Sequence, residues 1–155
     1  MRILRQPLWE CLAAFITSSM KRVSHISAMS HCLRGRFGKR LGTSVGDLFD
    51  YPDPDRLAGA GEAALRECGL GYRAPNLWRT AGLVGSGAAD LEGWRGLSDE
   101  ELREALCALP GVGVKVANCV MLFGYGRLAV VPIDVWVDRI VRESFLPRRR
   151  KVSSA

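Results

Sequence analysis

The stretch SDEELREALCALPGVGVKVANCVMLFGYGRLAVVPIDVWVDRIVRESF, residues 98–145, decides the fold of this chain. Ser98, followed by Glu101 three residues later, forms a capping box, which predicts that a helix begins there. Pro110 ends this helix, because proline lacks the backbone N–H that a helix interior needs. The next three residues, Gly111-Val112-Gly113, predict a turn too tight for a residue with a Cβ at either glycine.

A second helix is predicted to follow the turn, from about Val114 to Gly124. Its first N–H groups have no partner within the helix and suit a phosphate oxygen, so we expect Gly111, Gly113 and Val114 to bind phosphate. Lys115 lies in the first turn beside an apolar helix face, where its charge is disfavoured and a nucleophilic amine is favoured. The alternative for Lys115 is an ordinary solvated lysine.

Asp134 stands between a short apolar run, Val130–Ile133, and a helix predicted over Val135–Phe145. An aspartate in this place is an expected N-cap, because its carboxylate accepts hydrogen bonds from the first backbone N–H groups of the helix. Considered singly, a plain cap explains Asp134 and a solvated side chain explains Lys115. Together with the two glycines, however, they stand in one recognisable pattern.

Composition and charge bound the class of protein. Hydrophobic residues make up 48% of the 155 residues, which suffices for one domain with a buried core. The 22 Lys and Arg exceed the 16 Asp and Glu, and the net charge of +6 favours a polyanionic partner. The five cysteines form no CxxC pair, so neither a zinc site nor a disulfide framework is predicted and a reducing compartment is the default. No stretch approaches 18 apolar residues, so no membrane span is predicted.

The rest of the chain is predicted to be helices joined by loops. Further helices are expected to open at Pro7, to span about Lys21–Phe37, to open at Asp53-Pro54, to span about Glu62–Cys68, and to end near Val84. The segment Thr43–Asp55 is predicted to be a loop, and Val130–Ile133 is the only β-like run. We therefore predict an all-α fold. The basic segment 146–155 is expected to be a flexible tail, for which solvation and phosphate contact are equally favoured.

The pattern LPGVGxKxAxxV, a spacer and then VPxDvxVxRi resembles the signature of the helix-hairpin-helix DNA glycosylase superfamily. It is carried here by Leu109–Ala117 and Val131–Asp134, with Arg139. Two glycines, a lysine and an aspartate stand at the family spacing. The resemblance implies that Lys115 marks a bifunctional member, which also cleaves DNA at abasic sites, and that Asp134 is the shared catalytic carboxylate.

Outside this signature, the chain is similar to the 8-oxoguanine DNA glycosylase branch. Arg5–Ser19 resembles the first helix of its catalytic domain, and Gly69–Ala74 resembles its wedge loop. The resemblance implies that Tyr72 intercalates beside the vacated site and that Arg73 hydrogen-bonds the cytosine left behind. For Tyr72 the alternative is a core tyrosine. Cys119 stands where this branch has a cysteine that packs on the extruded base.

Three residues depart from the branch pattern. Met20 stands in a segment where the branch has asparagines that fill the gap left by the flipped base. His25 replaces an arginine that helps to enforce cytosine opposite the lesion, and Trp136 replaces a histidine that contacts phosphate. We therefore expect these three positions to contact the substrate with relaxed selectivity for the opposite base.

The resemblance also bears on cofactors. Cys107, Leu109 and Val112 stand where backbone carbonyls hold a structural monovalent cation, K⁺ or Na⁺, at the hairpin. No catalytic metal and no other cofactor is expected. The missing cluster cysteines argue against the iron–sulfur branch of the family.

The family domain is longer than this chain. Its β-rich N-terminal domain and its C-terminal helices have no counterpart here, so residues 1–155 are expected to be a truncated helical glycosylase domain with the helix-hairpin-helix at about 98–124. The implied function is base-excision repair: a glycosylase and abasic-site lyase that removes oxidised guanine from duplex DNA through a lysine Schiff base. An endonuclease III-like lyase for oxidised pyrimidines and a non-catalytic DNA-binding module are the alternatives. The expected partner is double-stranded DNA with a damaged base, not a membrane. We expect a monomer, cytoplasmic or nucleoid-bound in a bacterium and nuclear in a eukaryote.

Overall fold

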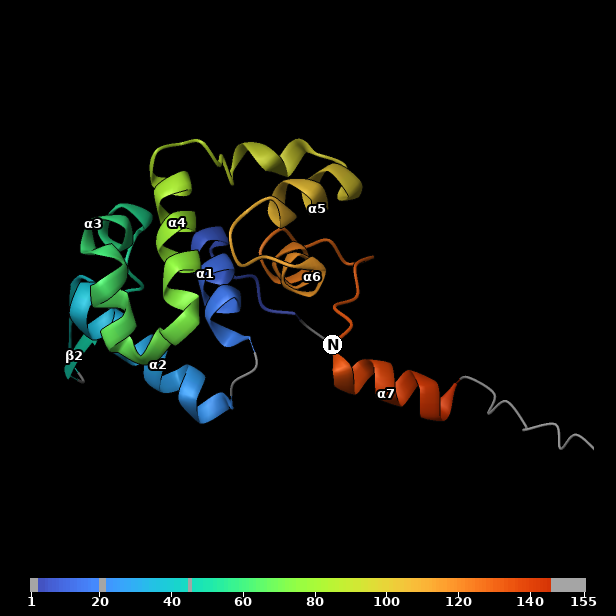
Figure 1. Cartoon of the computed structure of the whole chain (residues 1–155), viewed down its shortest axis with the longest axis horizontal. Coiled ribbons are helices and arrows are strands. Elements are labelled where there is room, and N and C mark those ends of the chain that lie inside the picture. Colours follow the sequence, from blue (N-terminus) through green and yellow to red (C-terminus); the bar gives the residue numbers. More distant parts are fainter. Residues whose placement is uncertain (1–2, 20–21, 45, 146–155) are drawn as a thin grey trace, which may run out of the picture.

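Helix α1 (Leu8–Ser18) runs through the middle of the molecule, with α4 on one side and α6 on the other (Figure 1). The computed structural model describes residues 3–19, 22–44 and 46–145. Cys11, Leu12 and Ala13 of α1 are completely buried. The first helix is therefore the centre of the hydrophobic core, in agreement with its nearly continuous apolar sequence.

Helix α2 (Val23–Phe37) ends at Gly38, as predicted, and leads into two short strands. Strand β1 (Arg40–Thr43) pairs antiparallel with β2 (Gly46–Phe49). This hairpin is a correction, because the sequence predicted no strand here and a loop from Thr43. Every residue of β1 is exposed, so the hairpin lacks the alternation of buried and exposed positions that reveals a strand in a sequence.

Helix α3 (Pro54–Leu65) begins at the predicted cap, where the Asp53 carboxylate accepts a hydrogen bond of 2.9 Å from Arg56 N. Gly61 interrupts it with φ +80°, so its two parts correspond to the two helices expected in this region. A π-helical turn η1 (Arg66–Leu70) and a 3₁₀ turn η2 (Gly71–Arg73) then lead into α4 (Ala74–Gly85).

The C-terminal part consists of the 3₁₀ turn η3 (Gly93–Gly96) and the helices α5 (Asp99–Cys107), α6 (Val114–Phe123) and α7 (Val135–Ser144). The capping box at Ser98 is formed as predicted, and α5 packs on α6. Helix α7 lies apart from the other helices, and none of its residues is buried (Figure 1). Within the described residues, no helix has the length and apolar content to cross a membrane.

Candidate active site

The glycine hairpin between α5 and α6 is tight at only one of its two glycines. Gly111 has φ +80°, and a Cβ built there would lie 2.7 Å from the Cβ of Asn76 on α4. Gly113, the N-cap of α6, has φ −99°, and a Cβ there would meet no atom within 4 Å. The expectation that both positions exclude a side chain is thus wrong for Gly113. The space in front of Gly113 is instead open for a ligand that approaches the backbone.

The hairpin is anchored to the core by a side chain of α4. The buried Thr80 hydroxyl donates a hydrogen bond of 3.0 Å to the carbonyl of Pro110. Val112 N donates to the carbonyl of Leu109 at 3.1 Å. These bonds hold the hairpin in place before α6, at whose start Gly113 and Val114 are both exposed.

Lys115 lies in the first turn of α6, above the face of an aromatic ring. Its Nζ is 5.4 Å from the centroid of the Phe15 ring, and this ring stacks on Phe123 at 5.8 Å between centroids. The amine therefore has the apolar neighbour that the sequence predicted, but the side chain as a whole is exposed rather than buried. The role of Phe15 was missed, because nothing in the sequence shows that α1 and α6 cross at this point.

Asp134 caps α7, as the sequence predicted. Its Oδ1 accepts hydrogen bonds from Trp136 N at 3.0 Å and from Val137 N at 2.9 Å. Both bonds go to the same oxygen, so Oδ2 is the carboxylate atom that can turn to a ligand. The carboxylate is half-buried.

One cavity of about 640 Å³ brings these parts together. Lys115 on α6 and Asp134 at the start of α7 both line this cavity. Gly111, Gly113 and Trp136 also belong to its wall. Sequence reasoning missed further residues that line it, which are mostly small or apolar: Ser18, Ser19, Val116, Ile133 and Val135. These positions carry no chemical signal of their own and are recognised only from the fold.

Cys119 lies one turn after Lys115 on α6 and is 3% exposed. Burial raises the pKa of its thiol, the adjacent Lys115 lowers the same pKa, and Asp134 raises it. The three predicted site residues are therefore close enough to act on one another electrostatically.

In the wedge loop, residues 69–74, one of the two predicted contact residues, Tyr72, is exposed and the other, Arg73, is buried. Tyr72 is 60% exposed, so the alternative of a core tyrosine is wrong. Arg73 is 3% exposed; its guanidinium donates to the carbonyl of Ser19 and, at 2.8 Å, to the hydroxyl of Tyr72. The guanidinium also lies 4.2 Å from the centroid of the Tyr72 ring. In this conformation Arg73 faces the protein and not a partner.

The remaining predicted residues are dispersed. His25 on α2 is exposed and lies beside the wedge loop, since a Cβ built at Gly69 would be 3.9 Å from its Nε2. Met20 and the basic segment 146–155 lie outside the described residues. Within the described part of the chain, no group of His, Cys, Asp or Glu side chains is arranged to hold a metal ion. The expected cation site at Cys107, Leu109 and Val112 would use carbonyl oxygens instead.

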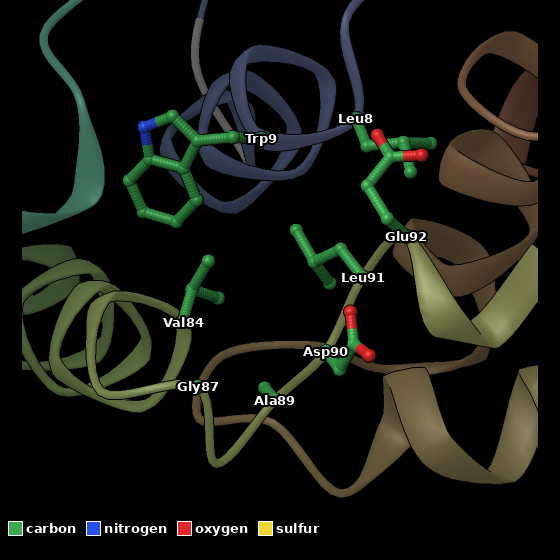
Figure 2. Close-up of a pocket in the computed structure, with 8 residues that line it drawn as sticks. All are labelled: Leu8, Trp9, Val84, Gly87, Ala89, Asp90, Leu91 and Glu92. Atoms are coloured by element: carbon green, nitrogen blue, oxygen red, sulfur yellow. The ribbon is translucent and has the colours of Figure 1, made fainter.

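A second hollow, of about 410 Å³, lies between α1, the end of α4 and the segment before η3 (Figure 2). Its two carboxylates have structural partners. Asp90 accepts a hydrogen bond of 2.9 Å from Gly93 N, and a hydrogen bond from Arg95 lowers the pKa of Glu92. The Trp9 indole donates to the carbonyl of Pro52 at 2.9 Å. This hollow therefore offers no pair of groups comparable to Lys115 and Asp134.

Comparison with known proteins finds similar proteins that are named as DNA glycosylases, although no family model matches the chain. The N-glycosylase/DNA lyase OGG1 of Arabidopsis thaliana is 35% identical over 155 residues, which cover 94% of this chain and 41% of the relative. Among solved structures, MBOgg1 in complex with a low-affinity DNA ligand superposes with a TM-score of 0.92 at 34% identity, over 96% of this chain and 51% of that one.

A third similar structure is the 8-oxoguanine glycosylase/lyase of Clostridium acetobutylicum bound to double-stranded DNA with cytosine opposite 8-oxoguanine. It has a TM-score of 0.89 at 33% identity, over 98% of this chain and 52% of that one. The chain thus spans about half the length of the relatives it matches. Over the part of their length that it covers, the chain is similar in sequence and fold to 8-oxoguanine glycosylases, which agrees with the resemblance to the helix-hairpin-helix DNA glycosylase superfamily carried by its sequence.

Proposed function

We propose that this chain is a DNA glycosylase with abasic-site lyase activity that removes 8-oxoguanine from duplex DNA in base-excision repair. The observation that supports the proposal is the shared cavity, which both Lys115 and Asp134 line. The relatives named N-glycosylase/DNA lyase and 8-oxoguanine glycosylase support the same reaction and the same lesion.

DNA binding begins at the hairpin. Gly113 and Val114 are exposed at the positive end of α6, and the open space in front of Gly113 would admit a phosphate that accepts from their N–H groups. The net charge of +6 adds a long-range attraction for the DNA backbone. Trp136, which is 66% exposed at the cavity wall, contacts the strand beside the lesion. A monovalent cation at the carbonyls of Cys107, Leu109 and Val112 would stiffen the hairpin.

The damaged base then leaves the stack and enters the cavity, with Cys119 behind it. Tyr72 refills the gap in the duplex. Arg73 turns out of the protein to the orphaned cytosine, which requires it to give up its bonds to Ser19 and Tyr72. Met20 and His25 contact the opposite strand near the gap.

The chemistry needs only the side chains of this chain. Neutral Lys115 attacks C1′ of the sugar, the bond from C1′ to the base breaks, and the base leaves with the bonding electrons and takes up a proton. Asp134 stabilises the positive charge that develops on the sugar through Oδ2, while Oδ1 remains in the helix cap. The sugar ring opens to an imine on Lys115, and β-elimination breaks the bond from C3′ to its oxygen.

Borohydride trapping tests the proposal directly. Reduction of the imine should leave a covalent complex between this chain and a duplex with an abasic site. Lys115→Gln should abolish this complex and retain DNA binding, because an amide nitrogen is not a nucleophile. Lys39→Gln, at another exposed lysine outside the cavity, is the matched control and should trap as the parent does.

A panel of duplexes separates the alternatives. Preference for thymine glycol over 8-oxoguanine would favour an endonuclease III-like lyase. Binding without any cleavage or adduct would instead indicate a non-catalytic helix-hairpin-helix module. An undiminished adduct in the Lys115→Gln protein would contradict the assigned nucleophile.

A further inference from the structure

Two cysteines from distant parts of the sequence meet behind the wedge loop. Cys32 on α2 and Cys68 on η1 are 36 residues apart, and their sulfur atoms are 2.7 Å apart, with the Cys32 thiol donating. Both are free thiols; Cys32 is half-buried, while Cys68 is only 4% exposed. Their sulfur atoms need to approach by less than 1 Å to reach the roughly 2.05 Å of a disulfide bond.

The surroundings keep this pair reduced at rest but leave it accessible from one side. Burial, followed by the contact with Cys32, raises the pKa of Cys68 to about 12, and the guanidinium of Arg36 opposes this shift. Arg36 is itself held by Glu67 at 2.7 Å, so a positive charge stays next to the sulfur atoms. Cys68 is thus protected, and Cys32 is the thiol that a small solute reaches first.

We propose that Cys32 and Cys68 form an oxidation site at which a hydroperoxide closes a disulfide between α2 and η1. The Cys32 sulfur attacks one peroxide oxygen, the O–O bond breaks, and a sulfenic acid forms with release of water or an alcohol. The Cys68 sulfur then attacks the Cys32 sulfur, the S–O bond breaks, and a second molecule of water leaves with the thiol proton. Two thiols are oxidised and one peroxide is reduced.

The disulfide would restrain the loop that follows it. Cys68 is followed by Gly69 and Gly71, which have φ +79° and +58° and act as the joints of the wedge loop. The loop then carries Tyr72 and Arg73, and Arg73 must turn outward to reach an orphaned base. This consequence rests on the proposed function: tying Cys68 to α2 should slow the outward turn and lower excision of 8-oxoguanine severalfold.

Thiol counting tests the oxidation site without any assay of activity. The reduced protein is treated with hydrogen peroxide under native conditions, then unfolded in denaturant, blocked with a maleimide and mapped by mass spectrometry. Two of the five cysteines should become protected, with Cys32 and Cys68 in one linked peptide, and dithiothreitol should release them. Cys32→Ser should abolish the link, and Cys107→Ser, at another half-buried thiol, should leave it intact.

The contrary outcomes are equally specific. Alkylation of all five cysteines after peroxide treatment would overturn the proposal. So would a link between Cys11 and Cys119, since Cys119 is near enough to raise the pKa of Cys11. The number of protected cysteines and the identity of the linked peptide are both measured on the unaltered protein. These two results therefore do not depend on whether the serine variants fold.

Activity is measured separately on the same samples. Oxidised protein should excise 8-oxoguanine more slowly than reduced protein, dithiothreitol should restore the rate, and the Cys32→Ser protein should not respond to peroxide. If the disulfide forms but the rate is unchanged, the consequence for the wedge loop is wrong. If no excision occurs in either state, the proposed function fails while the thiol count still decides the oxidation site.

Discussion

At the scale of single residues, Asp134 caps α7 and, in the proposed function, also faces a cationic sugar. Asp134→Asn should separate the two roles, because asparagine caps about as well as aspartate and offers Oδ1 to Trp136 N and Val137 N. We expect an unchanged melting temperature and a rate of base excision lowered about a hundredfold, since the negative charge is lost. Single-turnover kinetics and thermal melts measure the two effects.

Asp134→Ala is the control for this pair of roles. It should lower the rate in the same way and also weaken the start of α7, by about 1 kcal/mol for the lost cap. If Asp134→Asn retained the parent rate, the carboxylate would be a cap only.

The second prediction at this scale concerns Arg73. Arg73→Ala should reduce discrimination for cytosine opposite the lesion and spare cleavage at abasic sites. It should also lower the free energy of unfolding by about 1 kcal/mol, because the carbonyl of the half-buried Ser19 loses its donor. Arg79→Ala, at an exposed arginine on α4, serves as control. Excision rates measured opposite all four bases decide the matter, and an unaltered ranking would exclude Arg73 as the reader.

At the scale of elements, the glycine hairpin offers a matched pair of substitutions. Gly113→Ala should leave the fold intact, because no atom lies within 4 Å of the added Cβ, yet it should weaken DNA binding. A loss of about tenfold, or about 1.4 kcal/mol, on every sequence alike is expected. Gly111→Ala should destabilise the fold by about 1–3 kcal/mol, because its φ is +80° and its Cβ would collide with Asn76. Equal effects of both variants on melting would contradict this division.

The elements that the sequence predicts well are those with local end signals. The capping box at Ser98 and the Asp53-Pro54 start of α3 depend on neighbouring residues only, so both are formed where expected. The β1–β2 hairpin has no such signal, because its side chains face solvent on both sides of the two strands. Its short strands are held by backbone pairing, to which the pattern of side chains contributes little.

The candidate site divides in the same way. Lys115 and Asp134 were predictable because the hairpin and the cap fix them locally. The aromatic ring of Phe15 under Lys115, the burial of Arg73 and the open space at Gly113 depend on how distant helices cross. Such contacts between distant segments are absent from any local pattern.

At the scale of the whole molecule, the proposed function makes charge the main factor in the encounter with DNA. The net charge of +6 and the start of α6 would contact phosphates without reading bases. We therefore expect affinity for undamaged duplex to be weak and to fall steeply between about 50 and 200 mM salt. Fluorescence anisotropy at several salt concentrations measures the slope, and a flat response over this range would exclude backbone contact as the main source of affinity.

Helix α7 raises the last prediction at this scale, because Asp134, the proposed catalytic carboxylate, stands at its start and none of its residues is buried among the described residues. Its ten residues include none that is buried, and a helix this short is marginal in water without packing. Ion pairs of 2.9 Å between Arg139 and Glu143 and of 2.7 Å between Arg142 and Asp138 give it only modest support. Four of its large apolar side chains and that of its C-cap residue are more than a third exposed: Val135, Trp136, Ile140, Val141 and Phe145.

About half of the length of the relatives lies outside the region that this chain matches. This part of a relative can be used to test whether an added segment covers α7. In a chimera, the part of the Arabidopsis relative that follows the matching segment is joined after Phe145. If it covers α7 and completes the wall of the cavity, amide exchange in α7 should slow, and excision of 8-oxoguanine should rise more than cleavage at an abasic site. The difference is expected because an abasic site has no base for the added wall to hold. Equal gains on both substrates would mean that the added segment only stabilises α7 and the position of Asp134.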